Sequence, residues 1–104
     1  MNIGEVIETF RRKKKMRQGD LAKRANITQS YLSMIEGNKT DASIQTLKSI
    51  ANVLEIPVQL LVVYSLSSNQ IPDDKKNAYY RLMPLVQEII EEYFLSSDKN
   101  KKEK

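Results

Sequence analysis

The chain has 104 residues and a formal net charge of +4, so it can form one small domain with a modest core. It contains no cysteine and no histidine, which excludes disulfides and removes the commonest general base and metal ligand. No apolar run is long enough to span a membrane, and the N-terminus lacks the apolar core of a signal peptide. We therefore expect a cytoplasmic protein that needs no cofactor.

The positive charge is concentrated in residues 1–40. This segment has nine lysine and arginine residues against four acidic ones, whereas residues 65–104 have seven of each sign. A local excess of this kind suits a surface that faces phosphates. A solvated, lysine-rich helix end would show the same excess, and the basic run at 12–15 is open to both interpretations.

Apolar residues recur at helical spacing in residues 2–15, which predicts an amphipathic first helix that ends in the basic run. A second helix is predicted over about 18–25. Arg17 cannot cap this helix, but Asp20 in its first turn suits the positive helix end. Asn26 is predicted to be the turn residue that follows, because asparagine tolerates the left-handed conformation.

A third helix is predicted over about 29–36, with Thr28 as its N-cap and the pair Gly37-Asn38, permissive of positive φ, as its stop. Ser43 is predicted to cap a fourth helix, whose inward stripe is expected to be Ile44, Leu47, Ile50, Ala51 and Leu54. Pro57 then suits the first turn of a fifth helix at about 57–63. Five short helices without any strand signal predict a compact all-α domain over residues 1–64.

The composition changes at 65–72, which we interpret as a linker. Residues 73–95 then show a further helical pattern, which Pro84 should begin or kink. One face of this helix is expected to be apolar and to consist of Leu82, Leu85, Val86, Ile89, Ile90 and Tyr93. The charged tail at 96–104 contains no apolar residue and is expected to be disordered.

The third predicted helix has two unlike sides. At 100° per residue, Tyr31, Leu32 and Ile35 share an apolar arc that must pack on the domain. The opposite arc consists of Gln29, Ser30, Ser33 and Met34. An amide can bond to adenine, a hydroxyl can donate or accept, and a thioether can touch the thymine methyl, so this arc can read base edges in the major groove. An ordinary amphipathic surface helix has a similar composition.

Residues 3–63 resemble the helix-turn-helix domain of the Cro and phage-repressor type, the XRE family. The resemblance is carried by Ile3-Gly4-Glu5, Arg11, Gln18-x-x-Leu21-Ala22, the run from Thr28 to Glu36, and Leu47-x-x-Ile50-Ala51. It implies a compact five-helix repressor-like DNA-binding domain, to which the helical pattern at 73–95 adds a C-terminal amphipathic helix. The chain departs from the family pattern at Arg17, where a serine or threonine cap is usual, and at Asn26 and Glu55, where glycine is common.

The resemblance also implies roles for individual residues by their positions. Base reading falls to Gln29, Ser30, Ser33 and Met34. Contacts with the DNA backbone fall to Gln18, Thr28, Asn38 and Lys39, to which Arg17 can add a phosphate contact. Arg11 and Glu36 match an ion pair that ties the first helix to the end of the third.

The expected function is therefore sequence-specific binding of double-stranded DNA and regulation of transcription, as a repressor that acts as a homodimer on a palindromic operator. An enzyme is not expected, since no nucleophile–base pair or metal-ligand cluster is present. The apolar face of the C-terminal helix could self-associate, pack on its own domain, or bind another protein. An antitoxin, a restriction–modification controller, and an adaptor that no longer binds DNA remain open as alternatives.

Overall fold

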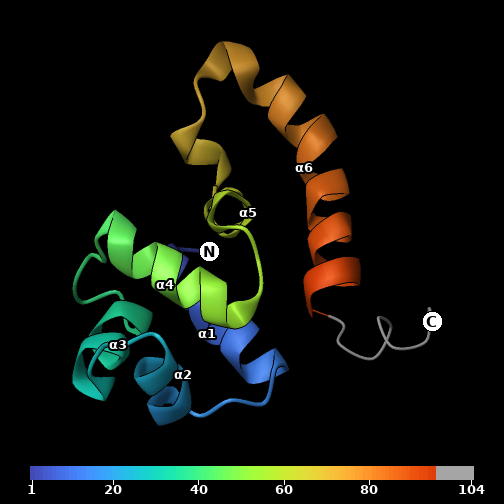
Figure 1. Cartoon of the computed structure of the whole chain (residues 1–104). Helices are drawn as coiled ribbons and strands as arrows, with labels where there is room; N and C mark the ends of the chain where they lie inside the picture. The colour runs from blue at the N-terminus through green and yellow to red at the C-terminus, as the bar shows by residue number, and fades with distance from the viewer. Residues whose placement is uncertain (96–104) are drawn as a thin grey trace, which may run out of the picture.

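The computed structural model describes residues 1–95, and every regular element in this range is helical (Figure 1). The N-terminal part consists of five α-helices: α1 (Ile3–Lys13), α2 (Gln18–Arg24), α3 (Gln29–Glu36), α4 (Ile44–Leu54) and α5 (Val58–Tyr64). The prediction of an all-α fold is confirmed, and the bounds of α3 agree at both ends with those expected. The predicted disorder at 96–104 lies outside the described residues.

Side chains close to the backbone define where the helices begin. At α1, the Glu5 backbone N–H donates to Asn2 Oδ1 at 2.9 Å and the Asn2 N–H donates to Glu5 Oε1 at 3.1 Å, a complete capping box. At α4, Ser43 Oγ accepts the N–H of Thr46 at 3.1 Å. Each cap satisfies backbone donors that have no partner within the helix.

Left-handed residues end several of these helices. Asn26 and Asn38 have φ of 63° and 59°, as expected for the turns after α2 and α3. Gly37 and Asn38 end α3 as predicted: Gly37 is the C-cap with φ of −83°, and the left-handed conformation is adopted by Asn38. Glu55, at the position where the family commonly has glycine, ends α4 in the left-handed conformation with φ of 62°.

The core lies between α1 and the other helices. Fully buried side chains come from every one of the five: Ile7, Phe10, Leu21, Leu32, Ile50, Leu54 and Leu61. Gly4 permits the closest helix approach, because a Cβ at this position would collide with the backbone carbonyl oxygens of Ile35 and Glu36. Helix α1 therefore lies directly against the end of α3. Ile44 does not join this core as predicted; it is 64% exposed at the start of α4.

Four elements follow α5 within the described residues, and the chain folds back toward α5 (Figure 1). A short 3-10 helix, η1 (Ser68–Gln70), lies within the predicted linker, and η2 (Asp73–Lys75) leads into α6 (Lys76–Ile90), which continues as the π-helical turn η3 (Glu91–Leu95). Pro84 lies inside α6 and does not begin it. Among residues 1–95 no single helix is long and apolar enough to cross a membrane; only α4 and α5 together would be, and they are bent by 98°.

Helix α6 packs on the domain through one side. Ile90 is fully buried in the common core and Met83 is also buried, while Val86 packs against the core from its edge. Ile90 therefore cannot belong to a partner-binding face, which corrects the predicted six-residue face. The physical reason is that Ile90 lies about 80° around the helix from Leu82, far enough to face α5 while Leu82 faces solvent.

A tyrosine on α5 joins the N-terminal domain to the C-terminal helix. The Tyr64 ring packs edge-on against Phe10, with ring centroids 5.8 Å apart, and its hydroxyl donates to Glu91 Oε2 at 3.0 Å. Burial of the phenol, followed by the hydrogen bond to Glu91, raises the pKa of Tyr64 above its ordinary value of 10.0. The phenol is therefore harder to ionise in the folded chain than in the unfolded one.

This shift predicts a loss of stability in alkali. A group that holds its proton more tightly in the folded state stabilises the fold fully below its unfolded pKa, and that contribution disappears as pH rises through the folded pKa. We expect the free energy of unfolding to fall above about pH 10 and Tyr64→Phe to remove part of this fall. Urea titrations across this pH range measure it, with the exposed Tyr80→Phe as control. Equal pH slopes for both variants and the unmodified chain would contradict the assignment.

Candidate nucleic-acid interface

Helices α2 and α3 form a unit with a tight turn at residues 25–28. Asn26 reverses the chain, and the N–H of Ile27 donates to the carbonyl oxygen of Ala22 at 2.9 Å. Thr28 then caps α3, because its Oγ1 accepts the N–H of Tyr31 at 3.0 Å. Local hydrogen bonds therefore fix the conformation of the turn that joins the two helices.

The outward arc of α3 is exposed and the inward arc is buried. Leu32 and Ile35 pack in the core, whereas Gln29, Ser30, Ser33 and Met34 are exposed. The four exposed residues and Gln18, from the start of α2, line one shallow hollow. The structure thus brings Gln18 beside the four residues that sequence analysis assigned to base reading.

Nothing within residues 1–95 covers this hollow. Helix α6 lies on the opposite side of the molecule from α3, with α4 and α5 between them (Figure 1). The side chain of Gln29 lies over Gly19, where an added Cβ would come within 3.4 Å of Gln29 Oε1. The outward arc of α3 is therefore open to a long ligand such as a DNA duplex. Gln29, the first residue of α3, packs against the start of α2.

A buried charged network holds the two helices to α1. Arg11 Nε donates to Glu36 Oε2 at 2.8 Å, Arg11 Nη2 donates to Glu36 Oε1 at 3.0 Å, and Arg11 Nη1 donates to the carbonyl oxygen of Met16 at 2.9 Å. Both charged side chains are less than a tenth exposed. The hydrogen bond with Glu36 raises the pKa of Arg11 against the opposing effect of burial, so the guanidinium stays charged.

Gln18 joins this network, a contact that sequence analysis missed. Its Nε2 donates to Glu36 Oε1 at 3.0 Å, which links the start of α2 to the end of α3. Because an amide group has two N–H bonds, one is directed inward and the second remains for an outside acceptor. No pattern in the sequence signals this contact, since Gln18 and Glu36 lie far apart along the chain and are joined only by the fold.

The remaining residues assigned to the DNA backbone surround the hollow from the helix ends. Arg17 and Thr28 directly precede α2 and α3, while Asn38 and Lys39 follow α3, and all four are exposed. Arg17 makes no side-chain cap, as expected; instead its backbone N–H donates to Asp20 Oδ2 at 3.1 Å. The guanidinium of Arg17 is therefore not used to cap α2.

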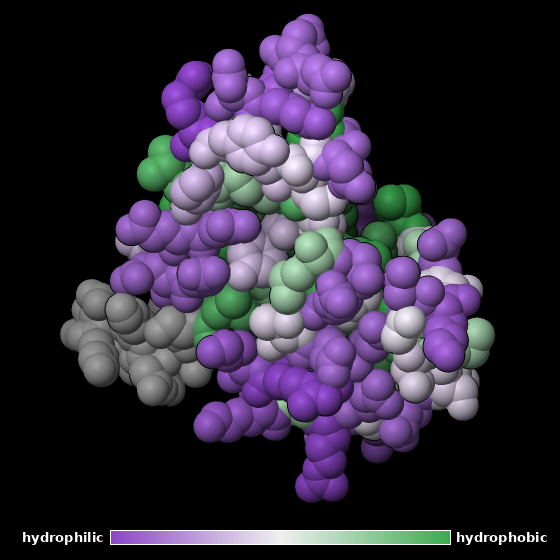
Figure 2. Space-filling model, turned by 180° about the vertical axis from the view of Figure 1, so that it is seen from behind, coloured by the Kyte–Doolittle hydropathy of each residue, from purple (hydrophilic) through white to green (hydrophobic). Residues whose placement is uncertain are grey.

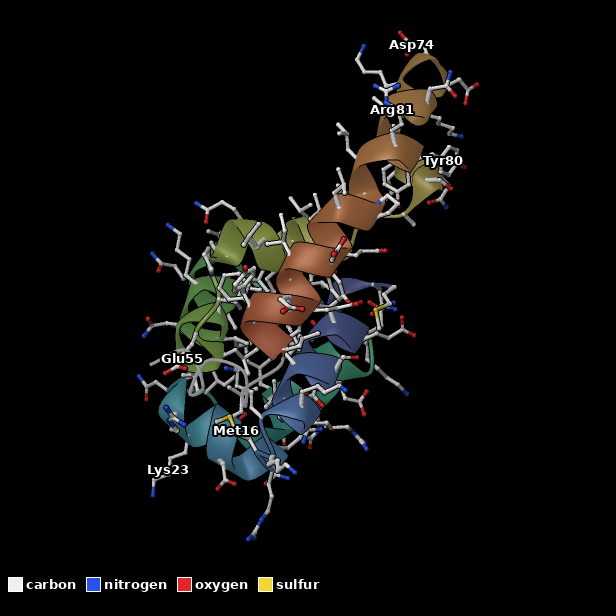
Figure 3. All side chains as sticks on the ribbon, turned by 90° about the vertical axis from the view of Figure 1, so that its right-hand side faces the viewer. Met16, Lys23, Glu55, Asp74, Tyr80 and Arg81 are labelled. Atoms are coloured by element: carbon white, nitrogen blue, oxygen red, sulfur yellow. The ribbon has the colours of Figure 1, made fainter. Side chains whose placement is uncertain are left out.

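Basic side chains extend from the same end of the molecule. Seen from behind, hydrophilic residues dominate the lower surface, over α2 and the end of α1 (Figure 2). The side chain of Lys23, in the last turn of α2, points away from the rest of the molecule into solvent (Figure 3). Within the basic run, Arg12 pairs with Glu8 at 2.7 Å and Lys14 approaches Glu55 at 3.7 Å, so part of the local positive charge is neutralised.

The arrangement is that of a DNA-binding helix-turn-helix unit: a capped, exposed helix supported by a second helix that meets it across a tight turn. Residues 7–61 match the family model described as Helix-turn-helix, which is more than half of the chain. The chain therefore belongs to the XRE-type helix-turn-helix family.

The chain is also similar to named regulators of Bacillus and of one of its phages. It is 37% identical over 62 residues to the immunity repressor protein of Bacillus phage phi105, covering 60% of this chain and 43% of that protein. It is 39% identical over 61 residues to the HTH-type transcriptional regulator SinR of Bacillus subtilis (strain 168) and to SinR of Bacillus licheniformis, covering 58% of this chain and 55% of each. The chain thus spans about half the length of these relatives. No solved structure gives a significant match.

Proposed function

We propose that the protein is a sequence-specific, double-stranded-DNA-binding regulator of transcription. The observation that supports this most strongly is the open arc of α3, on which Gln29, Ser30, Ser33 and Met34 are exposed and uncharged while the rest of the helix is fixed in the core. Uncharged polar side chains on a rigid helix suit the floor of the major groove, where the specific donors and acceptors lie.

Base recognition and backbone contact then fall to different residues. Gln29, at the first position of α3, reaches deepest and can bond adenine N6 and N7 together. The second N–H of Gln18 faces the DNA backbone, and Arg17 and Lys39 contact the phosphates of the two strands beside the groove. Thr28 and Asn38 contribute backbone contacts from the two ends of α3.

Repression is the mode of action that we propose. Both kinds of named relative are regulators, and one is a repressor by name. One module of this size covers too little DNA for tight binding, so a homodimer on a palindromic operator is the solution that the fold favours. A bound dimer would exclude RNA polymerase from an overlapping promoter in the cytoplasm, and no cofactor is needed for this.

Two substitutions test the assigned roles on the site selected from a random pool of duplexes. Gln29→Ala should lose about 1–3 kcal/mol on that site and relax the preference at one base pair, whereas Lys39→Ala should weaken all sequences alike and reduce the slope of log affinity against log salt by about one. Fluorescence anisotropy at several salt concentrations measures both. Gln59→Ala on α5 and Lys75→Ala in η2 are the matched controls.

Equal losses of Gln29→Ala on the selected site and on random DNA would contradict the base-reading role. The absence of any binding to duplexes at low salt would contradict the function itself and favour the adaptor alternative. An antitoxin or restriction–modification controller would still bind DNA; its second partner would need the exposed side of α6.

A further inference from the structure

Helix α6 has two apolar sides, and the domain uses only one of them. Ile90 and Met83 are buried, but Leu82, Leu85 and Ile89 are 53%, 57% and 50% exposed. Tyr93, in η3, continues this exposed side. A contiguous row of large apolar side chains on a helix surface marks an interaction site more often than single exposed ones do. We call Leu82, Leu85 and Ile89 the outer face of α6.

The charges beside the outer face form a simple pattern. Arg81 and Glu88 are both exposed and, seven residues apart, lie at nearly the same angle around the helix. Both are on the same edge of the outer face, and Arg81 is about 10 Å nearer the N-terminus of α6. This edge is therefore positive at one end and negative at the other.

The charges on this edge are complementary to those on the same edge of a second α6 helix that runs in the opposite direction. In an antiparallel pair of helices related by a two-fold axis, the same edge of each helix meets, so that Arg81 of one copy faces Glu88 of the second copy and the reverse. The apolar residues agree with this register: Leu82 faces Ile89 of the second copy, and Leu85 lies near the axis. A parallel pair would leave both charges without this complement.

We propose that the outer face of α6 pairs antiparallel with the outer face of α6 in a second copy of this chain. The inference deepens the proposed function, because it rests on the homodimer and assigns the surface and orientation that make it. The side of α6 that packs on the domain is left intact, and helix α3 lies on the other side of the molecule from α6 (Figure 1). One dimer can therefore present two α3 helices.

Cysteine cross-linking distinguishes the orientation directly, since the chain has no cysteine of its own. Under mild oxidation of the full chain, Leu85→Cys should form a disulfide-linked dimer. Leu82→Cys should not link to itself, because the two copies would lie about 10 Å apart along the axis, beyond the reach of a disulfide. A mixture of Leu82→Cys with a tagged Ile89→Cys chain should give the mixed dimer. Self-linked Leu82→Cys would show parallel pairing and overturn the proposal.

Charge exchange is the second test, measured as the dissociation constant by sedimentation. Arg81→Glu and Glu88→Arg should each weaken the dimer about tenfold, and the double variant should recover to within about threefold of the unmodified chain. Lys75→Glu is the matched control. A double variant as weak as the two losses combined, or a full chain that stays monomeric, would overturn the proposal.

These measurements need no DNA, so their failure is separate from that of the proposed function. Gln29→Ala should keep the dimer and lose sequence preference. Leu85→Glu, at an exposed position, should fold as judged by circular dichroism, remain monomeric, and bind a full palindrome no more tightly than a single half-site. Cooperative binding of the palindrome by this variant would show that the dimer forms elsewhere and would overturn the proposal.

Discussion

Glu36→Ala is expected to lower the free energy of unfolding by about 3–5 kcal/mol. The change leaves the Arg11 guanidinium in the core without its counter-charge, and a buried charge without a partner costs several kcal/mol. Gln18 loses its acceptor at the same time. A small domain has about 5–15 kcal/mol in total, so this variant should lie close to the unfolding limit. Urea denaturation followed by circular dichroism measures the loss.

Two further variants separate the cost of an unpaired charge in the core from the cost of losing an ion pair. Glu8→Ala breaks the exposed pair with Arg12 at 2.7 Å and should cost less than about 1 kcal/mol. Replacing both Arg11 and Glu36, by Met and Leu respectively, should recover most of the loss, because no charge is then left in the core. If Glu36→Ala costs no more than Glu8→Ala, water reaches the pair and the network does not anchor the α2–α3 unit.

The geometry around α3 was predictable because local chemistry fixes it. Thr28 caps the helix, Asn26 adopts the left-handed conformation before it, and Asn38 reverses the chain after it, each through contacts within a few residues. The division of α3 into a buried and an exposed arc follows from the helical period alone. The candidate base-reading surface therefore needed no knowledge of the tertiary structure.

Long-range contacts could not be predicted because a helical pattern does not say which other element packs against each side of the helix. Ile44 fits the apolar stripe of α4, yet it is the first residue of that helix and remains largely exposed there, outside the core. The Gln18–Glu36 contact joins two helices that only the fold brings together. For the C-terminal helix, apolar residues occupy so wide an arc that periodicity cannot choose between the side bearing Ile90 and the side bearing Ile89.

Those neighbouring isoleucines provide the second large prediction. Ile90→Ala should lower the free energy of unfolding by about 2–5 kcal/mol, because Ile90 is fully buried and its removal leaves a cavity. Ile89→Ala, the same chemical change one residue earlier, should cost less than about 1 kcal/mol within a single copy, because its side chain is half exposed. Urea denaturation at several protein concentrations separates this cost from any effect of Ile89 on association.

The pair of variants also decides how α6 relates to the DNA-binding domain. If Ile90→Ala unfolds α1 to α5 together with α6 in one transition, the C-terminal helix is part of the same cooperative unit. Truncation at residue 64 would then weaken DNA binding through lost stability as well as through loss of the outer face of α6. If Ile90→Ala instead costs as little as Ile89→Ala, α6 separates easily from α5. Helix α6 would then be an independent arm, and its inner side as well as its outer face would be available to a partner.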